Sequence, residues 1–201
     1  RLEACGYAKA KDTIAYPSHI EHHLPPAARR LIDTRRSDGL QVRALDMRRY
    51  GQEFDLITDI FNEAWSGNWG FIPFTEAEIR HMAKELKPLI QPSCVAIAEL
   101  NGKAVGFGVL LPNLNEAIAD FDGRLLPFNW LKLLLRLKRG TRTARVPLLG
   151  IRREHQGGVL GGLIAYLIID RLRNGARARG IKQVELSWIL EDNRPMRRII
   201  E

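Results

Sequence analysis

The sequence predicts an α/β (α+β) domain in which strands and helices follow one another along most of the chain. Three observations support this class. The segment LQVRALD, residues 40–46, alternates apolar and polar residues as a half-buried strand does. Two apolar runs flank Asn101-Gly102, the strongest short signal for a β-hairpin. An apolar run, a glycine-rich turn and a long helical pattern then follow one another over residues 146–178.

Two helices are expected between the first of these strands and the hairpin. Apolar residues recur at helical spacing from Phe54 to Ala64, and Asp46 is placed to cap the start of that helix. The second helix opens with Thr75 and Glu78, whose three-residue spacing is typical of a capping box. The predicted order up to this point is strand, helix, helix, hairpin.

Residues 113–143 form a long intervening segment, in which RLLPFNWLKLLLRLKRG is both apolar and basic. Such a stretch is able to lie on a membrane surface. We expect instead a helical flap packed over the domain, because one short stretch without a second anchor binds lipid only marginally.

The last part of the chain is predicted to contain a strand over residues 146–151, a helix over 159–178 and a strand over about 182–190. A final helix follows, with Asp192 or Asn193 as its cap and Pro195 in its first turn.

The composition is that of a globular protein, with 45% hydrophobic and 27% charged residues in 201. No run of about 18 uncharged apolar residues occurs, so no membrane span is expected. Cys5 and Cys94 lie far apart, which argues against a disulfide framework and makes the cytoplasm the expected compartment. No metal is expected, because His19, His22 and His23 lack a second cluster to complete a site.

The net charge of +8 is spread along the chain without a block of five like charges. No motif for reading nucleic acid accompanies it, so no nucleic-acid partner is expected. A solvated basic surface and an anionic ligand are the two interpretations that remain.

The glycine-rich turn EHQGGVLGGLI, residues 154–164, is the most informative stretch. Each glycine in a helix costs about 1 kcal/mol relative to alanine. Glycines at a helix start give an anion access to backbone N–H groups, and the helix dipole favours negative charge there. Arg152, Arg153 and His155 are expected to add positive charge. The turn fits neither the dinucleotide fingerprint nor the P-loop, and close helix–strand packing is the alternative reason for the glycines.

This order of elements resembles the GNAT superfamily of acyl-CoA N-acyltransferases over about residues 40–201. The cradle motif of that family, Q/R-x-x-G-x-G/A, is similar to QGGVLG at Gln156 to Gly161 and departs from it at Val159. The resemblance implies a mixed, mostly antiparallel twisted sheet flanked by helices, with a β-bulge or splay at the acyl-CoA site. Pro147 suits that place, because proline in a strand favours an edge or a bulge.

The resemblance also implies that acetyl-CoA (coenzyme A) is bound. Its pantetheine arm would pair with the backbone of Leu149, Gly150 and Ile151. The residues implied for the diphosphate are Gln156, Gly157, Gly158, Val159, Leu160, Gly161 and Gly162. Asn193 matches the family's asparagine near the sulfur. Ile200 stands where the family often has a tyrosine that protonates the leaving thiolate.

The implied reaction transfers an acyl group to the amine of a small acceptor by direct attack on the thioester. Glu185 is a candidate for the base, with Ser187 on the same strand face and Glu191 and Asp192 at its end as open alternatives. A structural or solvated carboxylate is the other interpretation of Glu185. The resemblance implies that the acceptor binds at the turn between the two helices, where Trp65, Asn68 and Trp69 lie. Exposed aromatic and amide groups there suit a ligand, and core packing is the other interpretation of the tryptophans.

Residues 1–17 resemble the C-terminal tail of a preceding GNAT-like domain, residues 18–38 a linker, and residues 39–201 a GNAT-like acyltransferase domain whose C-terminal end is missing. The full protein then resembles a bacterial group of tandem N-acetyltransferases, so a second GNAT-like domain is an expected partner. A permuted single domain, with residues 6–16 supplying the missing strand, and a dimer both stay open. The other function class is a catalytically degenerate module that binds coenzyme A or has a structural role, which Val159 and Ile200 favour.

Overall fold

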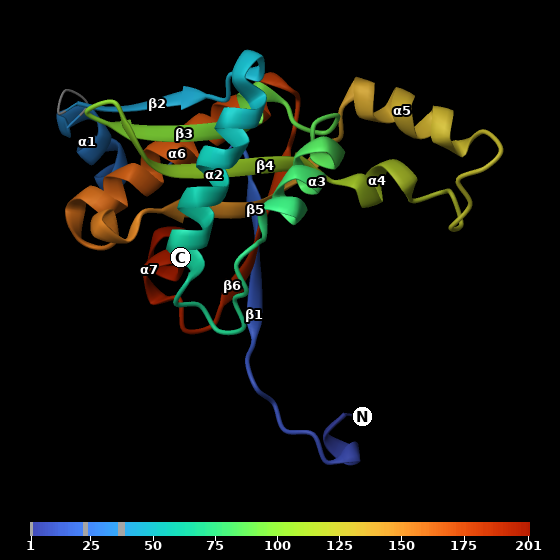
Figure 1. Cartoon of the computed structure of the whole chain (residues 1–201), viewed down its shortest axis with the longest axis horizontal. Coiled ribbons are helices and arrows are strands. Elements are labelled where there is room, and N and C mark those ends of the chain that lie inside the picture. Colours follow the sequence, from blue (N-terminus) through green and yellow to red (C-terminus); the bar gives the residue numbers. More distant parts are fainter. Residues whose placement is uncertain (1, 22–23, 36–38) are drawn as a thin grey trace.

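A six-stranded sheet forms the centre of the protein (Figure 1). The computed structural model describes residues 2–21, 24–35 and 39–201. The strand order is β1-β6-β5-β4-β3-β2, and neighbouring strands are antiparallel except for the parallel pair β5 and β6. This arrangement confirms the predicted α/β class and the mixed, mostly antiparallel sheet.

The elements follow the predicted order from the first predicted strand onward. The strands are β1 (Thr13–His19), β2 (Leu40–Ala44), β3 (Val95–Leu100), β4 (Lys103–Pro112), β5 (Thr143–Ile151) and β6 (Gln183–Leu190). The α-helices are α1 (Pro26–Arg35), α2 (Tyr50–Trp65), α3 (Glu76–Leu86), α4 (Leu114–Ile118), α5 (Asn129–Arg139), α6 (Gly158–Ala178) and α7 (Arg194–Ile200).

Local signals in the sequence account for several element ends. Asn101 and Gly102 both have positive φ, 51° and 78°, as a tight hairpin between β3 and β4 requires. Thr75 forms the expected capping box with Glu78 at the start of α3. Asn193 caps α7, because its side-chain oxygen accepts a hydrogen bond from the backbone N–H of Met196 at 3.2 Å.

Helices cover both faces of the sheet. The long helix α6 packs on β3 and β4 with α1 beside it, while α2 packs on β4 and β5 from the other side (Figure 1). Gly108 in β4 allows α6 to approach closely, since an added Cβ would lie 2.5 Å from the side chain of Ile168. Each face therefore has its own apolar core, one around Ile164 and Ile168 and one around Ile60 and Phe107.

The first strand belongs to the same sheet as the rest of the chain. β1 pairs with β6 from Thr13 opposite Leu190 to His19 opposite Gln183. It therefore crosses the predicted boundary between the tail (1–17) and the linker (18–38), and α1 within that linker packs on α6. The origin of residues 1–17 in a preceding domain stays a prediction, and His22 and His23 lie outside the described residues.

The segment between β4 and β5 differs from the expected flap. Its helix α5 forms as predicted, but α4 and α5 project beyond the end of the sheet instead of covering it (Figure 1). None of the residues of α5 is buried, because its main helical neighbour is the short α4. No helix in the described part of the chain has the length and apolarity to cross a membrane.

Candidate functional site

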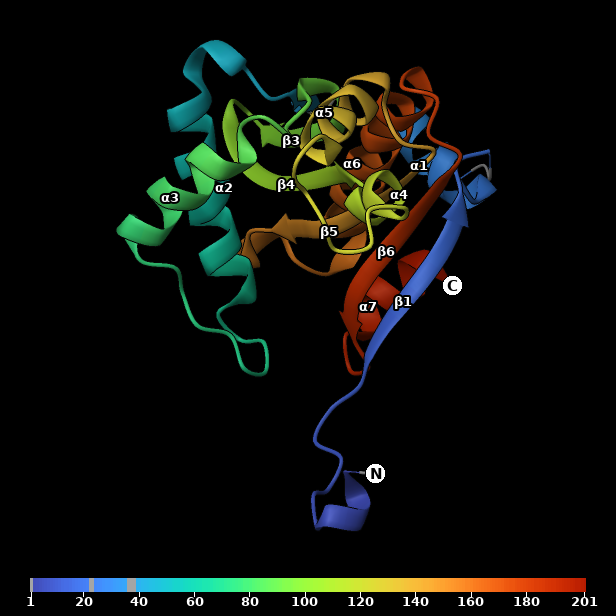
Figure 2. The ribbon, with the colours of Figure 1, turned by 90° about the vertical axis from the view of Figure 1, so that its right-hand side faces the viewer.

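The site begins where β5 and β6 separate. These strands pair in parallel only from Thr143 to Val146 of β5. At the next residue, Pro147, a β-bulge places two residues of β5 opposite Leu110 of β4. β6 then turns away with β1 (Figure 2). The second half of β5 is therefore bonded on its β4 side only, so alternate backbone groups of its other edge face the gap.

A cavity of about 310 Å³ occupies this gap, and we call it the β5–β6 cavity. Its walls come from the loop after α2, from β5, β6, α6, α7 and the end of β1. Most of the lining side chains are apolar, including Leu149, Ile169, Leu186, Ile189 and Met196. Its polar lining residues are Ser18, His19, Asn68, Arg173, Ser187 and Asn193. Such a site suits a ligand that is mostly apolar with a few polar atoms.

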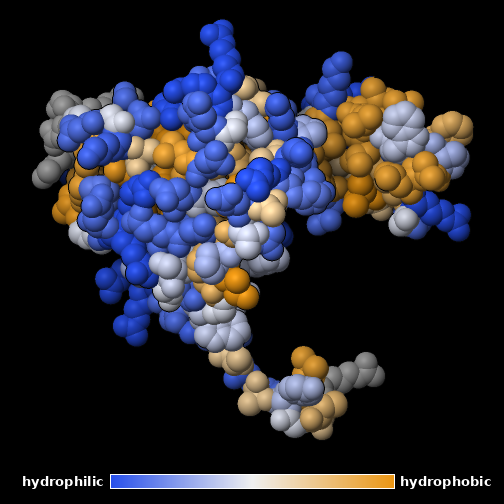
Figure 3. All heavy atoms as spheres, viewed as in Figure 1, coloured by the Kyte–Doolittle hydropathy of each residue, from blue (hydrophilic) through white to orange (hydrophobic). Residues whose placement is uncertain are grey.

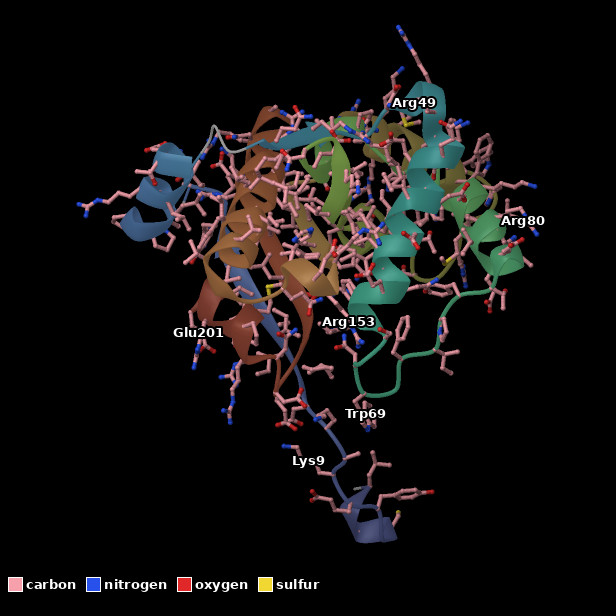
Figure 4. All side chains as sticks on the ribbon, turned by 60° about the vertical axis from the view of Figure 1, so that its left-hand side comes forward. Lys9, Arg49, Trp69, Arg80, Arg153 and Glu201 are labelled. Atoms are coloured by element: carbon pink, nitrogen blue, oxygen red, sulfur yellow. The ribbon has the colours of Figure 1, made fainter. Side chains whose placement is uncertain are left out.

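The residues predicted for the acceptor all line this cavity. Trp65 also belongs to the core, where its ring packs 6.3 Å from that of Phe107 and against Gly150. Trp69 lies in the loop after α2 and is 63% exposed (Figure 4). Core packing thus explains Trp65 in part, whereas Trp69 has surface free to contact a ligand.

Glu185 is held beside the cavity by two partners. The hydroxyl of Ser187, which is only 5% exposed and lines the cavity, donates to the Glu185 carboxylate at 2.6 Å. Arg145 of β5 pairs with the same oxygen at 2.7 Å. The Ser187 hydrogen bond, helped by the Arg145 charge and opposed by partial burial, holds the pKa of Glu185 below its usual value. The carboxylate is ionised at neutral pH, and Ser187 is the residue of this pair that lines the cavity.

The N-terminus of α6 lies directly after β5. Helix geometry leaves the N–H groups of Gly158, Val159 and Leu160 without an intrahelical acceptor. Nothing lies within 4 Å of a Cβ added at Gly157, Gly158 or Gly162. This open helix end fits an anionic group such as a diphosphate.

Gly161 packs closely against the turn before the helix, and its place in the diphosphate cradle stays a prediction. Its N–H already donates to Gly157 O at 3.2 Å, so it is not free for a ligand. An added Cβ would lie 2.6 Å from the carbonyl oxygen of His155. Gly161 therefore allows α6 to pack on the preceding turn.

The positive charge expected next to this helix end is partly neutralised. Arg152 donates to the carbonyl of Ala104 and pairs with Asp59 and Glu63 of α2. The Arg153 side chain lies against the loop after α2, where a Cβ added at Gly67 would meet it at 2.6 Å (Figure 4). Backbone N–H groups and the helix dipole add to the attraction for an anion at the start of α6.

The other residues implied for coenzyme A lie along the same edge. Leu149 lines the cavity, and Gly150 and Ile151 continue β5 from it toward α6. The side chain of Gln156 donates to Ile151 O at 2.8 Å, which ties the turn to the end of β5. Asn193 and Ile200 of the α7 region line the opposite wall.

Two contributors were missing from the predicted site residues. Ser187 was named only as an alternative to Glu185 on the same strand face. Arg145 was not singled out, although a charged residue inside an otherwise apolar strand was a visible signal. Its guanidinium also lies 5.3 Å from the ring centre of Trp188, so it links β5 to β6 just before the two strands separate.

The chain was compared with known proteins. No family model matches it. The bacterial ceramide synthase of Caulobacter vibrioides is 45% identical over 202 aligned positions, which cover all of this chain and 53% of that protein. Protein YghO of Escherichia coli is 43% identical over the same length and is covered to 52%. The chain thus spans about half the length of these curated relatives.

One solved structure has a similar fold. It is the GCN5-related N-acetyltransferase from Sphaerobacter thermophilus, which aligns with a TM-score of 0.60 and 15% identity. The alignment covers 98% of this chain and 50% of that one. At this level of identity, the likeness concerns the fold.

Proposed function

Because this chain has the fold of the GNAT superfamily, we propose that it is the acyl-transfer unit of an acyl-CoA-dependent N-acyltransferase whose acceptor is a long-chain amine. The single observation that carries this proposal is the β5–β6 cavity, which lies where β5 and β6 separate and has mostly apolar walls.

The class of acceptor is inferred from the cavity and a relative together. Apolar walls with few polar groups suit an amine on a hydrocarbon chain better than a highly charged small amine. The relative of 45% identity is named a ceramide synthase, and a ceramide is the amide of a fatty acid with a long-chain amino alcohol. We therefore extend the expected small acceptor to a lipid amine.

The donor fits the other end of the site. The free N–H groups of Gly158, Val159 and Leu160 would hold the diphosphate of coenzyme A. The unpaired edge of β5 at Leu149–Ile151 would hold the pantetheine arm. When bound, the thioester supplies an acyl group activated for attack by an amine.

Ser187 and Glu185 are placed to handle the proton of that amine. Ser187 lines the cavity, and its hydroxyl donates a hydrogen bond to the ionised Glu185. As the amine nitrogen bonds to the acyl carbon, the carbon–sulfur bond would break and the sulfur would leave as thiolate. The amine proton would pass to Ser187 while the serine proton passes to Glu185, or the amine proton would reach Glu185 through one water. A backbone N–H of β5 after the bulge would polarise the acyl carbonyl, and Asn193 would orient the donor from the opposite wall.

The test is an acyl-transfer assay on the complete protein. Long-chain acyl-CoA and acetyl-CoA are each offered with a long-chain amino alcohol or a short polyamine, and thiol release and amide product are measured. We expect product with the long-chain amine. Glu185→Gln and Ser187→Ala should each lower kcat by about tenfold to a hundredfold, in line with a lost proton-transfer group. Coenzyme A affinity should not change.

Glu76→Gln on exposed α3 is the matched control and should leave kcat unchanged. If the protein binds coenzyme A but transfers no acyl group to any amine offered, the degenerate binding module is the better description. Val159 at the cradle and Ile200 in the cavity wall favour that second candidate.

A further inference from the structure

The α4–α5 segment carries the largest gathering of exposed apolar side chains in the described part of the chain. Nine of the seventeen large apolar residues that are exposed there lie between positions 114 and 135. They are Leu114, Ile118, Leu125, Leu126, Phe128, Trp130, Leu131, Leu134 and Leu135. Figure 3 shows apolar residues gathered over this projection, away from the sheet. A monomer rarely leaves such a patch in water without a partner.

The apolar side chains of α5 share one side of the helix. Leu131, Leu134 and Leu135 follow the spacing i, i+3, i+4, which places them on one face with Trp130. All four are exposed, whereas Leu133 and Leu137 are half-buried. The indole N–H of Trp130 donates to Pro127 O at 2.9 Å, so the ring can enter an apolar phase without leaving its donor unpaired.

An ion-pair cluster fixes this face outward. Asp120, after α4, binds both Lys132 and Arg136 of α5. Arg136 also donates to the carbonyl of Ala117 in α4 at 2.7 Å. These contacts lock the half-buried side of α5 onto α4, so the helix cannot rotate its leucines inward without breaking them.

The patch is bordered by basic groups. Arg124 lies in the loop before α5, and Lys138 and Arg139 lie in its last turn; all three are exposed. Among the described residues, no carboxylate pairs with any of these three side chains in the structure. Long basic side chains can lay their stems on an apolar phase while their charges reach anionic headgroups.

We propose that the α4–α5 hairpin is the surface by which the protein docks onto a bilayer interface that contains anionic lipid. The apolar side chains enter the boundary between headgroups and acyl chains, and Arg124, Lys138 and Arg139 contact the headgroup phosphates. One short stretch alone would bind lipid only marginally. In the structure, the loop at 125–128 and α4 add exposed apolar side chains to those of α5. This inference does not depend on the acyl-transfer activity.

Vesicle flotation with the complete protein tests it. The probes are vesicles of 30% phosphatidylglycerol in phosphatidylcholine and vesicles of phosphatidylcholine alone. We expect binding to the anionic vesicles that weakens at 0.5 M salt, because screening at such ionic strength removes most of the headgroup attraction. Leu131→Gln/Leu134→Gln keeps helix propensity and should lower the partition coefficient by about tenfold or more, because two leucines no longer enter the membrane.

The charge component has a matched control. Lys138→Glu/Arg139→Glu should strongly reduce binding to the anionic vesicles. Arg48→Glu/Arg80→Glu changes the net charge by the same amount on other surfaces and should reduce this binding less. Tryptophan fluorescence of the vesicle-bound protein is measured with brominated lipid as the quencher. Quenching in the parent that is reduced in Trp130→Phe would place α5 in the bilayer.

Two outcomes would overturn the proposal. In the first, the leucine variant binds vesicles as the parent does. In the second, the protein binds neither kind of vesicle. Dissociation of an oligomer by the leucine substitutions would then show that a second copy covers the patch, and protection of the α5 amides from exchange would show that another part of the complete protein covers it.

Discussion

The glycines at the start of α6 have separate roles that their spacing does not reveal. Gly157 and Gly158 have φ of 79° and 59°, which turn the chain from β5 into the helix. Gly161 makes room for the backbone of the preceding turn. Only Gly162 combines ordinary backbone angles with open space around its missing side chain. A bulky residue at Gly161 would therefore disturb folding and could not report on ligand binding.

Val159 provides a cleaner test of the diphosphate cradle. Its side chain is 58% exposed in the first turn of α6. A glutamate there interacts favourably with the helix dipole, by about 0.3–1 kcal/mol, so Val159→Glu should leave the melting temperature unchanged or slightly raised. The same charge opposes a diphosphate, and repulsion between close charges of about 1–4 kcal/mol predicts a loss of coenzyme A affinity of tenfold or more.

Calorimetric titration of coenzyme A and thermal unfolding measure the two effects separately. Val159→Gln is the control, with similar size and no charge. Equal affinity in the glutamate and glutamine variants would show that the diphosphate does not bind at this helix end. A lower melting temperature in the glutamate variant would instead show that the first turn is not helical as described.

Long-range partners limited what could be predicted for single residues. The motif around Gln156 and the cap at Asn193 are local and were visible in the sequence. Arg152 appeared free to bind an anion, but Asp59 and Glu63, about ninety positions earlier, neutralise it. No periodicity or spacing connects residues that meet only because α2 packs over β5.

Helices and strands were predicted well where their signals are local, as at the hairpin, the capping box and the bulge beside Pro147. The position of α5 was not predicted correctly. Its amphipathic pattern shows that one face is apolar but does not say what covers that face. The short α4 contacts one side of α5 and leaves the apolar side exposed, so the expected packing over the domain was wrong.

The attachment of α5 to α4 depends on Asp120. Hydrogen bonds from Arg136 and Lys132 hold the pKa of Asp120 well below its usual range. A lowered folded-state pKa means that this contribution is complete above the unfolded carboxyl pKa of about 4 and is lost only as the pH falls below it. Asp120→Asn should therefore speed amide exchange in α5 at any pH from 5 to 9.

Hydrogen exchange detected by mass spectrometry checks this prediction. Peptides from α6 and β4 in the same variant are the internal reference and should keep the parent's rates. Asp122→Asn, which removes an exposed carboxylate two residues away, is the matched control. If α5 exchanges at the parent's rate in Asp120→Asn, the ion pairs do not hold the hairpin and its outward face needs another cause.

The assembly of the sheet joins segments that the sequence appeared to separate. Histidines and two prolines made residues 18–38 resemble a linker. In the structure, Ile20 directly follows β1, is 5% exposed and packs in the core beneath α6. Its N–H donates to Lys182 O at 3.0 Å, and its carbonyl accepts from Arg173 and Arg177. β1 and Ile20 thus complete the outer wall of the β5–β6 cavity.

The unfolding free energy distinguishes an integral β1 from an attached tail. If the first strand folds with the rest of the chain, Ile20→Ala removes buried methyl groups and should lower that free energy by about 2–5 kcal/mol. Ile72→Ala removes the same groups from a residue that is 80% exposed, and a surface change of this kind costs less than about 0.5 kcal/mol. Urea denaturation of both variants measures the difference. Equal small losses would mean that β1 is docked loosely, and the cavity would then be open along β6.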